Sequence, residues 1–418
     1  MTTPEELTDD QLLALVHERG LVRAAAARWT VRSFAEEWLR GLPSTNTRRT
    51  YRTHVERLCD GVGPICESTT CEPCLVATDE DDKRRFTCRC ECRTCRDSRI
   101  QVTAQGDLPL SPEALSKRNA TALVRIARRM ALKQGIVDNR SRAARGLPAK
   151  QAPGIGAEET CIAALRSLFK SAAEELHTDI DGAADIEKPG RPTGRRRALH
   201  DFELVELFEV AVGGGGDPEL DELLFDFGLM TGARREGTYG ATVGALHPEE
   251  QLVTVKDKYA VPVPMPVSAE LVERLLSHAT FRGGAACDPK SRSFQPDAPL
   301  FYYKPYRNGA SHPLTDKHFT ALHARWQHSL PWAAELGVTF HWLRHTMSEM
   351  LKRDFGQHFA QRFLRHTEKT VTDRYGQCST EQLAGALGAI FGFEHPLAAA
   401  HTQRRQEVLA RYGLATDG

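Results

Sequence analysis

The chain has 418 residues, of which 41% are apolar, and its 55 lysines and arginines balance its 55 aspartates and glutamates. This length is enough for two or three globular domains and excludes a single small module. No run approaches the about 18 uncharged apolar residues of a membrane span, and the acidic N-terminus lacks the basic-then-apolar order of a signal peptide. We therefore expect a cytoplasmic protein that contacts no membrane.

The first part of the chain is predicted to be helical. An amphipathic pattern indicates a helical arm over residues 1–30, and the stretch Ser44-Thr45-Asn46-Thr47 supplies an N-cap for a second helix. Ser111 followed by Pro112 predicts the start of a long basic helix, and a further helix is expected after Gly156. This half therefore reads as a helical domain.

A cysteine-rich block interrupts these helices, because eight of the eleven cysteines lie between residues 59 and 95. Two Cys-x-x-Cys pairs about seventeen residues apart have the spacing of a closed, structural tetrathiolate zinc site. The predicted ligands are Cys71, Cys74, Cys92 and Cys95, with Cys59, Cys66, Cys88 and Cys90 as a second set that could hold another ion. The alternatives are disulfides, an iron–sulfur cluster, a redox-sensitive segment or a protein-docking module.

Basic residues gather in two places. Residues 117–145 contain nine basic side chains against one acid, which fits either a surface that faces a polyanion or a solvated helix. Residues 186–198 combine arginines with prolines and glycines, as in an extended linker that could cross phosphates. The candidate DNA-binding residues are Arg118, Arg125, Arg128, Arg129, Lys133, Arg195, Arg196 and Arg197.

The second half is predicted to contain helices at 201–212 and 218–230, and helices again from about residue 268. Between them, residues 252–255 and 261–264 resemble two short strands, and the prolines of the second make it an edge strand. The predicted fold class is mainly α with a small β-sheet (α+β).

Side chains able to act on a phosphate group recur in this half in a fixed order. In chain order they are Arg234, Lys256 or Lys258, His341 with Arg344, and His366 with Tyr375. The helical spacing of Leu343, Met347 and their apolar neighbours predicts that His341 and Arg344 project together from the polar face. An isolated His-x-x-Arg is usually a solvated surface pair, so its weight here comes from the other members of the set.

In order and spacing, the set resembles the tyrosine recombinase (phage integrase) family over residues 200–385. The Thr-Gly-Ala-Arg stretch resembles the first arginine box, which makes Arg234, and not Arg235, the first catalytic arginine. The second box shows the usual nine-residue step from His366 to the nucleophile, Tyr375. The resemblance implies a helical core-binding domain and a tyrosine-recombinase-type catalytic domain.

Three positions depart from the family pattern. Gly237 stands where an acid is usual, with Glu236 one place early, and Arg365 stands where a glycine usually precedes the histidine. The hairpin is short, so Lys256 and Lys258 compete for the lysine role; Lys256 is favoured by its distance to the second strand.

The set also makes chemical sense by itself. Tyrosine, with a pKa near 10, is a poor nucleophile unless a base takes its proton and the electrophile is polarised. The two arginines can polarise a phosphodiester, His341 can accept the Tyr375 proton, His366 can donate to the phosphate, and Lys256 can protonate the leaving 5′ oxygen. The expected product is a 3′-phosphotyrosine linkage, and no cofactor or ATP is needed for catalysis.

The predicted layout is an N-terminal arm (1–30), a core-binding domain (31–185) with the cysteine-rich insertion (59–95), a basic linker (186–198), a catalytic domain (199–395) and a tail helix (396–418). The resemblance implies a homotetramer on double-stranded attachment sites, with a directionality factor or host bending protein as an accessory partner. The tail could dock on a neighbouring subunit or pack on its own. The composition, rich in alanine and arginine, suggests a bacterium or its mobile element, with the protein associated with the nucleoid.

Two other functions are compatible with the sequence. One is a catalytically decayed integrase that only occupies a DNA site, and the other is a strand-relaxing type IB topoisomerase, which uses similar chemistry. The complete catalytic set favours an active enzyme, and the step from His366 to Tyr375 favours a recombinase.

Overall fold

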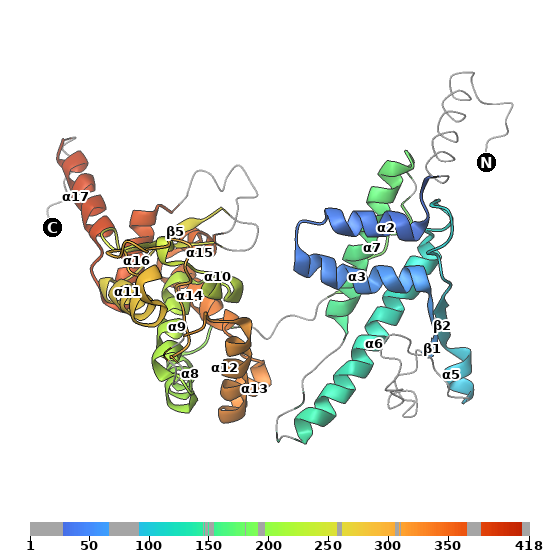
Figure 1. Ribbon diagram of the computed structural model, residues 1–418, viewed down its shortest axis with the longest axis horizontal. Helices are drawn as coiled ribbons and strands as arrows, with labels where there is room; N and C mark the ends of the chain where they lie inside the picture. Colours follow the sequence, from blue (N-terminus) through green and yellow to red (C-terminus); the bar gives the residue numbers. More distant parts are fainter. Residues whose placement is uncertain are drawn as a thin grey trace. The chain divides into compact units, whose positions relative to one another are not determined.

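The computed structural model forms two compact units, residues 1–194 and 195–418 (Figure 1). The division falls inside the predicted linker. The structure describes residues 28–66, 92–144, 146, 149, 154–179, 181–190, 197–256, 261–305, 309, 311–365 and 378–411. Helices dominate both units and each holds one small antiparallel sheet, which confirms the predicted α+β class. The predicted arm over residues 1–30 lies almost wholly outside the described residues.

The first unit is built around two long helices, α6 and α7, which pack against each other, with α3 against both. Its described elements are α2 (Val31–Gly41), α3 (Thr45–Asp60), β1 (Val62–Cys66), α5 (Arg93–Asp97), β2 (Arg99–Val102), α6 (Lys117–Ala143) and α7 (Ile155–Glu175). The apolar stripes of α6 and α7 supply buried Leu123, Ile126, Leu165 and Phe169 to one core. As predicted, Ser44 caps α3, since its side chain accepts from the N–H of Thr47.

The predicted start of the basic helix is wrong by one turn and a half. Ser111 accepts from the N–H of Ala114 and caps a separate turn, whereas α6 begins at Lys117 behind its own N-cap, Ser116. The Ser-Pro pattern therefore identified a local cap correctly but did not show that the chain turns again before the helix begins.

A two-stranded antiparallel sheet that the sequence analysis missed begins inside the cysteine-rich block and is completed just after it. β1 pairs antiparallel with β2, with Ile65 opposite Ile100 and Cys66 opposite Arg99. The two strands are short, and Gly63 and Pro64 interrupt the first, so no alternating pattern was visible. Cys59, the predicted first residue of the insertion, lies in α3 and is buried in the core of the unit.

The second unit contains most of the helices. Its described elements are α8 (Asp201–Gly214), α9 (Pro218–Thr231), α10 (Arg235–Tyr239), a 3₁₀ turn (Val243–Ala245), β3 (Leu246–His247), β4 (Leu252–Val255), β5 (Val263–Pro266), α11 (Ala269–Gly283), a 3₁₀ turn (Gly284–Ala286), α12 (Asp316–Ser329), α13 (Pro331–Leu336), α14 (His341–Phe355), α15 (Gln357–Phe363), α16 (Thr380–Phe391) and α17 (Pro396–Arg411). The sheet order is β3-β4-β5, so β5 is an edge strand as its prolines predict.

Helix α9 is the centre of this unit. It packs against α8, α10, α11, α14 and β5, and most of its side chains are buried. Phe227 meets Phe301 edge to face, with ring centroids 5.2 Å apart. Because so many elements rest on α9, the position of its C-terminal end is fixed from several sides.

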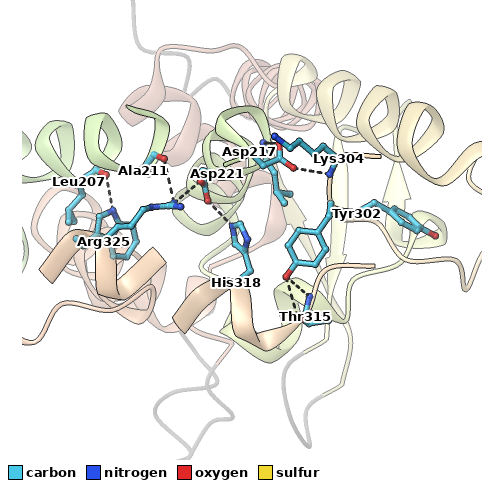
Figure 2. A network of polar contacts seen from close by, with 12 residues as sticks. Leu207, Ala211, Asp217, Asp221, Tyr302, Lys304, Thr315, His318 and Arg325 are labelled. Carbon is cyan, nitrogen blue, oxygen red and sulfur yellow. Dashed lines mark hydrogen bonds and ion pairs between the residues drawn. The ribbon is translucent and has the colours of Figure 1, made fainter. Parts of the chain in front are cut away.

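A buried polar network ties α12 and the segment before it to α8 and α9 (Figure 2). The fully buried carboxylate of Asp221 lies 2.7 Å from His318 Nε2 and accepts from Arg325 Nη2 at 2.6 Å. Asp217 accepts from the backbone N–H of Lys304 at 2.9 Å and from both terminal nitrogens of Arg282. Charges at this depth need such partners, and these pairs therefore hold the helices in one arrangement.

The last two helices, α16 and α17, pack against each other, and α17 has no buried residue. Within the described part of the chain, no single helix is long and apolar enough to span a membrane. Only α16 and α17 taken together meet that criterion of length and composition, and they are bent by 119° at their break.

Candidate active site

The first arginine box is the turn between α9 and α10. Thr231 ends α9, and Gly232 is its C-cap in the left-handed conformation, with φ of +56°. A Cβ at Gly232 would lie 2.5 Å from the Phe363 ring, so the site needs glycine for conformation and for space. Arg234 follows as the half-buried N-cap residue of α10. The Thr-Gly stop thus places Arg234 at a sharp turn.

The neighbouring arginine has a different environment. Arg235 Nε lies 2.7 Å from the carboxylate of Asp316, the first residue of α12. This ion pair ties α10 to α12, and it occupies Arg235 in a contact between helices. The choice of Arg234 as the candidate phosphate ligand is compatible with this geometry.

The pair His341 and Arg344 does not share one exposed face, contrary to the prediction from helical spacing. His341 is the exposed first residue of α14, whereas Arg344 is only 2% exposed. Arg344 Nη1 donates to the carbonyl of Gly232 at 2.5 Å, and its Nη2 donates to the carbonyl of Leu364. The first box and the end of α15 cover this side of α14, which is why the arginine is buried.

The remaining members of the set are placed only in part. Lys256 is exposed and directly follows β4, one residue past the pairing of Val255 with Val263. Lys258, His366 and Tyr375 lie outside the described residues. The hydrogen bond from Arg344 to Gly232 therefore brings Arg344 to the turn that carries Arg234, while Lys256 and His341 lie at the ends of elements in the same unit.

The residue at the unusual position before His366 makes contacts that the sequence analysis missed. Arg365 has φ of +52°, a left-handed conformation that costs a residue with a Cβ roughly 1 kcal/mol. Its Nη1 donates to the carbonyl of Thr231 at 2.6 Å, and its Nη2 donates to that of Gly232 at 2.9 Å. The only sequence signal was the departure itself, an arginine where the family usually has glycine.

Two guanidinium groups thus meet at the C-terminal end of α9. Arg344 and Arg365 both donate to the Gly232 carbonyl, two residues before Arg234. Carbonyls at a helix C-terminus carry partial negative charge, so cations are stabilised there. Planar arginine forks near one turn are suited to bind the non-bridging oxygens of a phosphodiester and the charge that builds on them.

The described cysteines fall into two environments. The Cys66 thiol donates to Cys95 Sγ at 3.1 Å, and Cys92 Sγ accepts from the N–H of Cys95, as in a tight Cys-x-x-Cys turn. Cys59 is separate: it lies in the apolar core, and burial raises its pKa to about 11, which disfavours the thiolate that a metal needs. Among the described residues, no three His, Cys, Asp or Glu side chains form a group that could hold a metal ion. Cys71, Cys74, Cys88 and Cys90 lie outside the described residues.

Burial divides the candidate DNA-binding residues on α6. Arg118, Arg125 and Arg128 are exposed, and Arg128 lies 3.4 Å from Glu158. Arg129 and Lys133 are buried, and Arg129 Nε donates to the carbonyl of Cys66 at 3.0 Å. Arg129 therefore binds a backbone carbonyl of its own unit, and both side chains expose far less surface than Arg118, Arg125 and Arg128. The number of basic residues in this stretch of the sequence did not show which of them lie on the buried face of α6 and which on its exposed face.

Of the linker arginines, the structure describes Arg197. Arg197 makes a two-pronged ion pair with buried Glu203, at 2.6 and 2.5 Å, and Glu203 also accepts from the N–H of His200. The hydrogen bonds from Arg197 hold the pKa of Glu203 below its ordinary value. Arg197 therefore fixes the start of α8, and its role as a DNA contact stays a prediction. Arg195 and Arg196 lie outside the described residues.

Comparison with known proteins gives the family. Residues 197–382 match the model of the phage integrase family, which covers nearly all of the second unit up to α16. The second unit therefore contains a domain of the phage integrase family, the tyrosine recombinases. No curated protein matches the chain at a significant level.

Several solved structures are similar at low identity. The Tn1549 transposon integrase in complex with transposon right end DNA is 15% identical, with 87% of this chain and 100% of that chain covered and a TM-score of 0.49. A lambda integrase dimer bound to a COC′ core site is 14% identical (83% and 77% covered, TM-score 0.44). A lambda integrase tetramer bound to a Holliday junction is 13% identical (84% and 78% covered, TM-score 0.45).

Proposed function

We propose that the protein is a site-specific DNA recombinase that cleaves and rejoins strands through a 3′-phosphotyrosine intermediate, for integration or excision of a mobile element. The observation that carries the proposal is the contact between Arg344 and the first arginine box. Within the segment that matches the phage integrase family, Arg344 donates to Gly232 at the turn that carries Arg234. Two arginines from distant parts of the sequence are thereby held at one helix end, as a phosphate clamp requires.

In this proposal, each residue of the set has one task. Arg234 and Arg344 bind the scissile phosphate, and losing one such clamp raises the barrier by several kcal/mol, on the order of 3. His341 takes the proton of Tyr375, Lys256 protonates the leaving 5′ oxygen, and His366 donates to the phosphate. The covalent linkage stores the energy of the broken bond, so a 5′ hydroxyl can reseal the strand without ATP or a catalytic metal.

A covalent-trapping assay tests the proposal. Wild-type protein and the Tyr375→Phe variant are mixed with labelled DNA from the flanks of the protein's own gene, and detergent-resistant adducts are counted. We expect adduct with the wild type alone and DNA binding within about twofold in both, because the phenol oxygen alone forms the bond. An adduct with the variant would disprove the assignment of Tyr375.

The same assay separates the two other functions. Binding of one fragment by both proteins with no adduct in either would favour a decayed integrase that occupies a site. Adduct on any sequence, together with relaxation of supercoiled plasmid, would favour a topoisomerase. The sequence order and the family match support the recombinase.

The proposal extends to the partners of the protein and to the first unit. The protein would act on double-stranded DNA as a homotetramer in the bacterial nucleoid, with a directionality factor or a bending protein as a partner. Arg118 and Arg125, seven residues apart on the exposed side of α6, would contact phosphates. A structural zinc module in the cysteine-rich block would stiffen the first unit, and the proximity of Cys66 to Cys95 supports it.

A further inference from the structure

Arg365 occupies a backbone position that favours glycine. Its φ of +52° is left-handed, where a Cβ is crowded by the following carbonyl. Such a position persists in a bulky residue when contacts of its side chain outweigh the strain, and it often marks a functional site. The contacts of the Arg365 side chain must therefore compensate for the strain of its backbone.

The guanidinium of Arg365 joins three carbonyls of two elements. It donates to Thr231 and Gly232 at the end of α9, and to Phe363 at 3.2 Å at the end of α15. The first two are carbonyls that α9 leaves without helical partners, and a cation at this end also meets the favourable side of the helix dipole. A planar fork can serve adjacent carbonyls at once, which the single ammonium of lysine does less well.

The bridge connects the two boxes at their reactive ends. On one side, Gly232 is two residues before Arg234, and its carbonyl is shared with Arg344. On the other side, Arg365 directly precedes His366 in the sequence. A change in this bridge would move the phosphate-binding arginines relative to the segment that begins at residue 366, without touching the substrate.

We propose that Arg365 is a positioning residue, which locks the first arginine box against the second and so sets the catalytic arginines in place. The inference rests on the proposed recombinase function. A glycine at this position would adopt the left-handed conformation without strain. With Arg365, charge-assisted hydrogen bonds from the side chain to the end of α9 hold the turn in that conformation.

The kinetic test compares Arg365→Gly and Arg365→Lys with the wild type. Glycine removes the bridge and relieves the backbone, and lysine keeps the charge without the fork. We expect Arg365→Gly to slow single-turnover adduct formation on saturating DNA by about 10- to 100-fold, the cost of a misplaced catalytic group, with DNA affinity changed by less than about twofold. Arg365→Lys should recover part of the rate. Arg353→Gln is the control, since Arg353 is exposed and paired only locally with Asp354, and it should react at the wild-type rate.

A second measurement does not depend on catalysis. Hydrogen exchange of the peptide that spans residues 232–240 should be at least about tenfold faster in Arg365→Gly and unchanged in Arg353→Gln, because the turn loses its anchor. Unchanged exchange together with a wild-type rate would overturn the positioning role. If the wild type forms no adduct but exchange still responds to Arg365→Gly, the recombinase proposal fails while the bridge stands.

Discussion

At the scale of single residues, Gly232 meets three demands at once. Its φ is left-handed, the Phe363 ring packs where a side chain would begin, and its carbonyl accepts from Arg344 and Arg365. Any side chain at this position would displace Phe363 or the turn itself. Gly232 is therefore the residue whose size fixes how closely the two boxes approach.

Replacing Gly232 with alanine should lower the free energy of unfolding by about 2–4 kcal/mol, from left-handed strain of roughly 1 kcal/mol and overpacking of about 1–3 kcal/mol. Gly337→Ala is the matched control: Gly337 is also a left-handed helix C-cap, but a Cβ there would meet nothing within 4 Å. Urea unfolding of both variants measures the difference. Equal losses would show that Phe363 moves aside freely.

A buried histidine should make stability depend on pH. His278 Nε2 accepts from the N–H of Tyr302, and burial lowers the pKa of His278 to about 4. Between about pH 6.5 and pH 4, His278 therefore stays neutral in the folded protein, whereas in the unfolded chain, where its pKa is the ordinary 6.5, it binds a proton. Stability is full above pH 6.5 and falls as the pH drops toward 4, by roughly 3 kcal/mol in all at 1.36 kcal/mol per pH unit.

The matching variant is His278→Gln, whose amide oxygen can accept the same hydrogen bond but does not titrate. Between pH 6.5 and 5, the wild type should lose about 2 kcal/mol more than this variant in urea unfolding. Contributions from other histidines, such as buried His54, are common to both proteins and cancel. Parallel loss in the two proteins would mean that His278 is protonated in the folded state.

At the scale of elements, the sequence predicted the helix ends that are determined by a few neighbouring residues. Ser44 before α3 and the Thr-Gly stop after α9 are capping signals that act within a few residues, and both matched the structure. The sheet β1–β2 was missed because its strands are short, far apart in sequence and interrupted by glycine and proline. Pairing of distant short strands depends on what packs beside them, which a sequence pattern does not contain.

In the candidate active site too, some features could be predicted from neighbouring residues and others depend on distant packing. The turn at Arg234 follows from the helix stop before it, so its place could be predicted. The depth of Arg344 could not, because the end of α15, twenty residues later at Leu364, covers it and accepts one of its hydrogen bonds. Burial of Arg129 and Lys133 in α6 has the same origin, since tertiary packing, and not the charge count, decides which basic residues reach solvent.

At the scale of the whole molecule, the chain has two separate cores, one in each unit. The family match lies in the second unit, whereas the cysteine cluster lies in the first. Because proteins with more than one domain depart from two-state unfolding, we expect the two units to unfold as two transitions in calorimetry of the full chain. Gly232→Ala should lower only the transition of the second unit, which assigns the two.

Metal removal should then act on the first unit alone. If zinc is bound by the cysteine-rich block, protein purified without added metal contains at least about one zinc per chain, because closed thiolate sites bind tightly. A strong chelator or Cys95→Ser should lower the melting temperature of the first transition by several degrees, and leave the second unchanged, since the lost binding energy belongs to one unit. Cys161→Ser is the control for a lost thiol in the same unit, as Cys161 is buried in α7 and is not among the predicted zinc ligands. Less than one zinc per chain, or a first transition indifferent to the chelator, would contradict the zinc module and turn attention to Cys66 and Cys95 as a redox-sensitive thiol pair.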